Sequence, residues 1–300
     1  MFPTVNEGGS ILVVAERGPG DSALLVKALQ LARSFGAGLE LFLCDAERAY
    51  ALRQAYQQEG VENVRKACIA EALEYLSRLK GSAHAMNVPI SIDAACESPL
   101  CEAIVRKART CEPLLVVKSG GGSDATGSRM LDFNDWHLMR ACPATLLLTR
   151  GRTWRPIPRV AAAVDVSEQE TVGLARLIVQ TASALAHAYD TDVELLYVER
   201  ESPDSAGSQR RKLALEALAH DSHLRDEQVH LIPGEPEQEL GTLAASEDYD
   251  ILVVGTLTHR DALAPLVGTL TAKLVDLLDC DFMLVKFGAR DLPQPASPGR

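Results

Sequence analysis

The chain repeats one pattern of residues in its two halves, and this duplication restricts the folds that it can adopt. Pro99 and Glu102 correspond to Pro236 and Glu239, which lie 137 positions further along the chain. In both halves a strand-length apolar run follows this pair at the same distance. The order of these sequence elements and the spacing between them both agree in the two halves. This agreement indicates two copies of one structural unit rather than chance similarity.

Each copy alternates short apolar runs with segments of helical periodicity. The runs are continuously apolar, which is typical of parallel strands buried on both faces. Helices between them predict crossover connections. The expected fold class is α/β, with two tandem, doubly wound, parallel-sheet domains of Rossmann-like type. The predicted strands are 11–14, 39–43, 90–92, 114–117 and 144–149 in the first copy, and 160–164, 193–198, 229–232, 251–254 and 282–286 in the second.

Helices are expected between these strands, where apolar residues recur with a period near 3.6. Ser98 is expected to be the N-cap of one helix, with Pro99 at its first position. Further helices are predicted over residues 24–35, 62–86, 134–141, 174–185, 211–220 and 270–278.

The chain length of 300 residues also suits two domains. We expect a first domain over residues 1–150 and a second over 159–290. A linker over residues 151–158 is rich in turn-forming and cationic residues. The last ten residues, 291–300, contain three prolines without periodicity and are expected to form a tail.

Composition and charge exclude several classes of function. Lys and Arg number 30 against 41 Asp and Glu, so the formal net charge is −11, which disfavours nucleic acid as a partner. No apolar run has the length of a membrane helix, and the N-terminal residues lack the pattern of a secretory signal. The seven cysteines are an odd number and lie mostly in apolar surroundings, as reduced, buried thiols do. We therefore expect a soluble, cytoplasmic protein with no nucleic-acid or membrane partner.

A glycine-containing segment after the strand 251–254 is the most informative candidate site. Gly255 leaves the strand, and Gly268 and Thr269 open a helix that also contains Thr271. Free N–H groups at a helix N-terminus suit a phosphate, and the two threonine hydroxyls would add donors. The alternative is that the glycines are turn residues and Thr269 is an N-cap. Spacing alone leaves both interpretations open.

This segment resembles the G-x2-G-x9-G-[ST] motif of the universal stress protein family, which cradles ATP phosphates in that family. Thr258 stands where the motif has its middle glycine, a departure that puts a side chain into the loop. Asp165 matches the family aspartate that lies against the nucleoside, although it could equally cap the following helix, and Val198 matches the residue near the adenine. The resemblance thus implies a site for ATP or another adenine nucleotide at Asp165, Val198, Gly255, Thr258, Gly268, Thr269 and Thr271.

The first copy departs from this motif. Lys118 replaces the first glycine, and Glu16 stands near the aspartate position. Residues 132–143 instead carry a D-W-H-L-x-R-x-C-P stretch, which resembles the tandem, two-domain (UspE-type) branch of the family. The resemblance therefore implies a degenerate nucleotide site in the first half and a partial one in the second.

The family resemblance implies stress-linked binding and regulation rather than turnover, and it assigns no catalytic residue or metal ligand. It also implies that the final strands of the two copies, 144–149 and 282–286, pair as an intrachain pseudo-dimer. It does not identify a protein partner.

Other functions stay open from the residues alone. The protein could be a scaffold that holds another small ligand or a protein partner without ATP, or a slow nucleotide hydrolase. The loop 119–124 resembles the S-G-G-x-D-S loop of ATP pyrophosphatases. The cysteines and histidines do not have the spacing of a zinc site. Cys101 lies near a predicted helix start, which could lower the pKa of its thiol and make it reactive.

Overall fold

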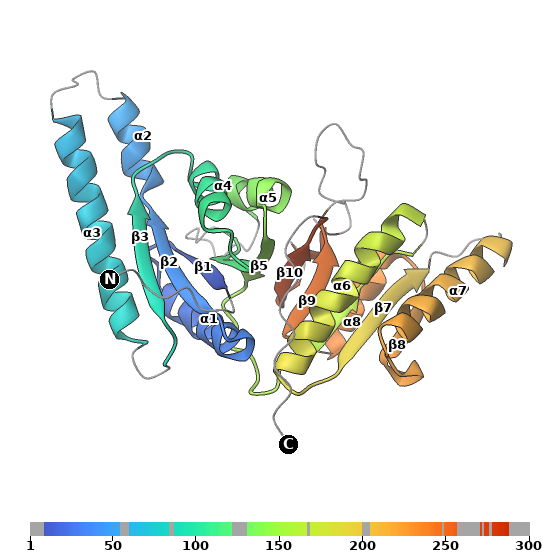
Figure 1. The fold of residues 1–300 in the computed structure, drawn as a ribbon. Coiled ribbons are helices and arrows are strands. Elements are labelled where there is room, and N and C mark those ends of the chain that lie inside the picture. Colours follow the sequence, from blue (N-terminus) through green and yellow to red (C-terminus); the bar gives the residue numbers. More distant parts are fainter. Residues whose placement is uncertain are drawn as a thin grey trace.

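The chain forms one hydrogen-bonded sheet of ten strands, in the order β3-β2-β1-β4-β5-β10-β9-β6-β7-β8 (Figure 1). This computed structural model describes residues 9–54, 60–83, 87–121, 131–166, 169–199, 205–247, 249–256, 271, 273–275 and 278–287. The strands are β1 Ser10–Ala15, β2 Gly38–Cys44, β3 Ile90–Ala95, β4 Leu115–Ser119, β5 Thr145–Thr149, β6 Val160–Ala163, β7 Val193–Glu199, β8 Val229–Pro233, β9 Ile251–Gly255 and β10 Asp281–Val285. Neighbours are parallel except for β5 and β10, which run antiparallel at the centre. The predicted α/β class and the parallel strand pairing within each half are confirmed.

Helices cover both faces of the sheet because successive strand residues point to opposite sides. Ile11 and Val13 pack into one core, and Leu12 and Val14 pack into the other. The first core is covered by α1 Asp21–Phe35, α3 Val61–Gly81, α6 Gln169–Ala188 and α7 Ser205–Asp221, and the second by α4 Leu100–Cys111, α5 Phe133–Ala141 and α8 Pro236–Glu247. None of the helices in the described ranges has both the length and the apolar character needed to cross a membrane.

The sequence prediction missed or misplaced several helix ends. Helix α2, Ala46–Gln54, was not predicted, because Ala49 is its one buried residue and the helix therefore lacks an apolar stripe. The prediction of Ser98 as an N-cap is wrong: α4 begins at Leu100 with the extended Pro99 as its cap and no side-chain hydrogen bond. Helix α7 begins at Ser205, six residues before the predicted start.

The two halves meet through their last strands, β5 and β10, as the family resemblance of the repeated units implied. Leu146 pairs with Leu284, Leu147 with Met283, and Leu148 with Phe282. Leu146 and Leu284 are equivalent positions of the two copies, because both lie four residues after Cys142 and Cys280 respectively. A pair of equivalent residues facing each other across antiparallel strands is the signature of a pseudo-twofold axis.

A buried carboxylate ties this junction to the rest of the chain. Asp281, at the start of β10, lies 2.5 Å from the Lys27 ammonium group on α1. The main-chain N–H of Arg150 donates to it at 2.7 Å, and the indole N–H of Trp154 donates at 2.8 Å. Burial raises the pKa of Asp281, while Lys27 and the two N–H donors act to lower it. One side chain thus contacts the first half, the connecting segment and the second half.

We expect Asp281→Ala to lower the free energy of unfolding by about 3–5 kcal/mol, because Lys27 would remain buried without a counter-charge. The measurement is urea unfolding followed by circular dichroism. The matched control is Asp221→Ala, which breaks an exposed pair with Arg176 and should cost no more than about 1 kcal/mol. Equal losses in both variants would contradict this role.

Candidate functional site

Each half of the sheet has a switch point at which the strand order reverses. In the first half it lies between β1 and β4, and in the second between β6 and β9. Ligands of open α/β sheets bind beyond the carboxyl ends of the strands at this point. The residues there are Glu16 and Lys118 in the first half, and Asp165 and Gly255 in the second.

In the second half, three of the predicted site residues lie at the same edge of the sheet. Ala163 pairs with Leu196, so the register brings Asp165, two residues on, level with Val198 on the neighbouring strand. Gly255 ends β9, and β9 pairs with β6 on the side opposite to β7. Asp165 is exposed and Val198 is buried. A carboxylate at this switch point and an apolar residue on the next strand, β7, therefore lie at the same level.

Gly255 is surrounded closely on its α6 side. A β-carbon at this position would lie 2.6 Å from the Cδ2 atom of Leu174 and 3.3 Å from the Cδ1 atom of Ile178. The Thr271 hydroxyl donates a hydrogen bond to the Gly255 carbonyl at 2.7 Å. The absence of a side chain at Gly255 therefore allows α6 to pack closely against the end of β9. The hydrogen bond from Thr271 connects Gly255 to the helical residues that follow. The hydroxyl hydrogen of Thr271 is used within the protein rather than offered to a ligand.

The remaining residues of the glycine motif, Thr258, Gly268 and Thr269, lie outside the described residues, as do residues 122–124 of the pyrophosphatase-like loop. The phosphate-binding part of the site thus stays a prediction from the sequence.

In the first half, the Lys118 side chain is buried at the position that corresponds to Gly255. Its ammonium group lies 2.9 Å from a carboxylate oxygen of Asp135 and 2.9 Å from one of Glu16. It also donates to the main-chain carbonyl of Ser119 at 2.8 Å. Burial acts to lower the pKa of Lys118, but the two carboxylates outweigh it and raise that pKa. Burial raises the pKa of Glu16, against the effect of Lys118.

The start of α5 is occupied by carboxylates of the chain itself. The Asp132 side chain accepts a hydrogen bond from the main-chain N–H of Asp135 at 2.7 Å. The Asp135 side chain accepts from the N–H groups of Gly121 at 2.8 Å and Asp132 at 3.3 Å. These donors would otherwise be available to an anion. The first-half switch point therefore carries an internal ion-pair network where the family motif has a phosphate site.

The sequence analysis noted Lys118, Glu16 and the segment 132–143 separately, but it did not predict that they meet. Asp135 was missed as the partner of Lys118. The available signal was an isolated charge in an apolar strand, because a buried lysine requires a carboxylate nearby. The choice of partner depended on the tertiary structure, which places Asp135 of α5 beside Lys118 of β4.

A cavity of 810 Å³ opens beside this network, at the carboxyl ends of β1 and β2 and the start of α4. Arg17 pairs with Asp45 across it at 3.3 Å. The charged residues that line this cavity are two arginines and four carboxylates: Arg17, Arg48, Glu16, Asp45, Glu47 and Asp132. This excess of negative charge disfavours a polyphosphate in the first half.

The proposed reactivity of Cys101 is not supported. Its side chain is fully buried, and burial raises the pKa of the thiol despite hydrogen bonds from the backbone at the helix start. Within the described ranges, no group of three or more His, Cys, Asp or Glu side chains is arranged to hold a metal ion.

Comparisons with known proteins point to one family. The family model described as the universal stress protein family matches residues 157–286. Universal stress protein E of Escherichia coli K12 is 24% identical over 92% of this chain and 93% of its own length.

Solved structures show the same fold over nearly the whole chain. A functionally unknown protein from Pseudomonas aeruginosa PAO1 superposes with a TM-score of 0.73 at 21% identity, covering 93% of this chain and 92% of that one. A universal stress protein from Archaeoglobus fulgidus has a TM-score of 0.71 at 10% identity, covering 93% and 99%. The fold of this chain, over both of its halves, therefore also occurs in these two proteins.

Lys118→Met should lower the free energy of unfolding by about 3–5 kcal/mol, because the fully buried Asp135 would lose its counter-charge. The control is Lys273→Met in the second half, whose pair with Glu237 is half exposed and should contribute no more than about 1 kcal/mol. Chemical denaturation of both variants decides the comparison. A similar small loss in the two would mean that the network does not stabilise the fold.

Proposed function

Because the chain belongs to the universal stress protein family as a tandem, two-domain member, we propose that this stress-response protein acts by binding an adenine nucleotide in its second half. The proposed units are residues 1–150 and 159–290, joined by the linker 151–158. Their proposed role is regulation rather than turnover. The proposed compartment is the cytoplasm, where the free cysteines would stay reduced.

The observation that carries this proposal is the alignment of Asp165, Val198 and Gly255 at the switch point between β6 and β9. A nucleoside presents hydroxyl and amino donors, which a carboxylate such as Asp165 accepts. Its base presents an apolar face, which suits Val198. The phosphates would extend toward Gly268 and Thr269, as the resemblance to the family motif implies.

The contrast between the halves supports placing the nucleotide in the second one. In the first half the N–H donors at the start of α5 are bonded to Asp132 and Asp135, and Lys118 is neutralised. An incoming polyphosphate would have to displace these carboxylates. At the position of Lys118 the second half has Gly255, which brings no side chain into the edge of the sheet.

A second candidate function rests on the 810 Å³ cavity of the first half. A volume of this size accommodates a small molecule. The cavity would hold a ligand other than a polyphosphate, as expected of a scaffold that does not use ATP. Native mass spectrometry of the purified protein would detect a retained ligand, and its mass would separate this function from nucleotide binding.

We expect Asp165→Ala to weaken ATP binding about tenfold to a hundredfold, because a hydrogen bond to a charged group contributes about 1.5–3 kcal/mol. Isothermal titration calorimetry of the full chain is the measurement. Asp192→Ala is the control, since Asp192 is an exposed acid in an ion pair with Arg225, just before β7 at the opposite edge of the sheet. The proposal is wrong if the unaltered protein binds no ATP at millimolar concentration.

Thr258→Gly should tighten ATP binding, because it restores the middle glycine of the motif and removes a side chain from the loop. Gly268→Val should weaken binding by crowding the phosphate position. The same titrations test both variants, with phosphate release measured in parallel. Unchanged affinity in both would remove the glycine segment from the site, and phosphate release that depends on Gly268 would indicate a hydrolase instead.

A further inference from the structure

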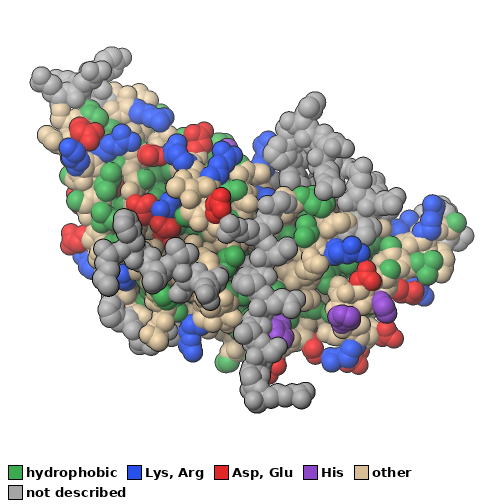
Figure 2. All heavy atoms as spheres, in the orientation of Figure 1, with side chains coloured by type: hydrophobic (Ala, Val, Ile, Leu, Met, Phe, Trp, Pro, Cys, Tyr) green, Lys and Arg blue, Asp and Glu red, His purple; other side chains and the backbone are tan. Residues whose placement is uncertain are grey.

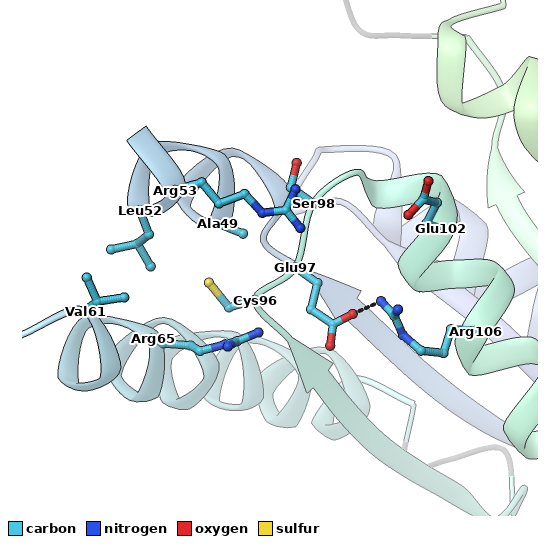
Figure 3. A pocket seen from close by; sticks show the side chains of 10 residues that line it. All are labelled: Ala49, Leu52, Arg53, Val61, Arg65, Cys96, Glu97, Ser98, Glu102 and Arg106. Atoms are coloured by element: carbon cyan, nitrogen blue, oxygen red, sulfur yellow. Dashed lines mark hydrogen bonds and ion pairs between the residues drawn. The ribbon is translucent and has the colours of Figure 1, made fainter. Parts of the chain in front are cut away.

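A second cavity of the first half, of 470 Å³, lies between α2, α3 and α4 at the end of β3 (Figure 3). Of its lining residues it shares only Ser98 with the 810 Å³ cavity. It therefore lies away from the switch point of the sheet, and neither the nucleotide proposal nor the ion-pair network at Lys118 involves it.

Three helices each direct one arginine to this cavity. Figure 3 shows Arg53 of α2 and Arg65 of α3 on either side of Cys96, and Arg106 of α4 joined to Glu97. Among the residues that the structure describes, neither Arg53 nor Arg65 has a hydrogen bond or ion pair. Each guanidinium group presents five N–H donors in a planar fork that matches a carboxylate or a phosphate.

The charge balance of the lining favours an anion. Three arginines face two carboxylates, Glu97 and Glu102, and Glu97 is already paired with Arg106. This local excess of positive charge occurs in a chain with a net charge of −11. Elsewhere on the face in Figure 2, Lys and Arg lie interspersed with Asp and Glu. Arg53 and Arg65, which have no partner among the described residues, therefore give this cavity a local excess of positive charge.

The inner wall of the cavity is apolar. Ala49 and Cys96 pack with Cys68 in a small cluster that is separate from the two main cores, with Leu52 packed against it. Val61 faces the cavity from the start of α3 (Figure 3). Cys96 is only 3% exposed, so the wall offers an apolar surface rather than a reactive thiol. A ligand that fits has a charged end and a short apolar part.

We propose that this cavity binds a small organic oxyanion, a carboxylate or a phosphate monoester. The anionic group pairs with Arg53 and Arg65, and the apolar part rests against Leu52, Val61 and Cys96. The cavity volume lies at the lower end of the range for small-molecule sites, which limits the ligand to a compact molecule. The proposal is independent of nucleotide binding in the second half.

The test is calorimetric titration of the full chain with four anionic probes: hexanoate, acetate, phenyl phosphate and inorganic phosphate. Hexanamide and phenol serve as uncharged counterparts. We expect hexanoate to bind more tightly than hexanamide and acetate, or phenyl phosphate to bind more tightly than phenol and inorganic phosphate. In each set the first control lacks the charge and the second lacks the apolar part. The tighter of the two identifies whether the site prefers a carboxylate or a phosphate.

The decisive variant replaces the two arginines that lack a partner in the described part of the chain, Arg53→Gln and Arg65→Gln. Both side chains are exposed, so the fold should be retained. The affinity for the bound anion should fall about tenfold or more, whereas Arg109→Gln, an exposed position of α4 outside the cavity, should leave it unchanged. The proposal is overturned if neither hexanoate nor phenyl phosphate binds at millimolar concentration, or if the double variant binds as the unaltered protein does. An ATP titration of the double variant separates the two proposals, since it should match that of the unaltered protein.

Discussion

The buried ion pair between Asp281 and Lys27 joins residues that are 254 positions apart. Trp154 and the Arg150 backbone bond to the same carboxylate. The antiparallel pairing of β5 with β10 joins only the last strands of the two halves. Asp281 adds a connection from β10 to α1 and to the connecting segment, which stabilises the arrangement of the two halves.

The same physical constraint, a buried charge that needs a partner, makes the two copies different. Lys118 is buried in the first half, and Asp135 and Glu16 neutralise it. That network uses the donors at the start of α5 and closes the place at which an anion would bind. In the second half Gly255 stands at the position of Lys118 and brings no charged side chain of its own. The two halves thus share one framework, and they differ in the side chains at the ends of equivalent strands.

The two halves consequently suit different ligands. The second half presents an acidic and an apolar residue at its switch point, as expected for a nucleoside. The first half has a net acidic cavity beside Lys118 and a cationic cavity between α2, α3 and α4. The continuous ten-stranded sheet connects the halves that carry these features.

The sequence by itself determined the duplication, the α/β class and the parallel strands, because each depends on local periodicity and on the order of apolar runs. The pairing of the final strands followed from the resemblance to the family. It also indicated that Lys118 departs from the glycine motif. Only the tertiary structure decided that Asp135 neutralises Lys118, that burial keeps the pKa of Cys101 raised, and that Arg53 and Arg65 face one cavity. These outcomes depend on distances between segments far apart in the chain, and α2 shows why: with one buried residue, it leaves no periodic signal, yet it forms one wall of that cavity.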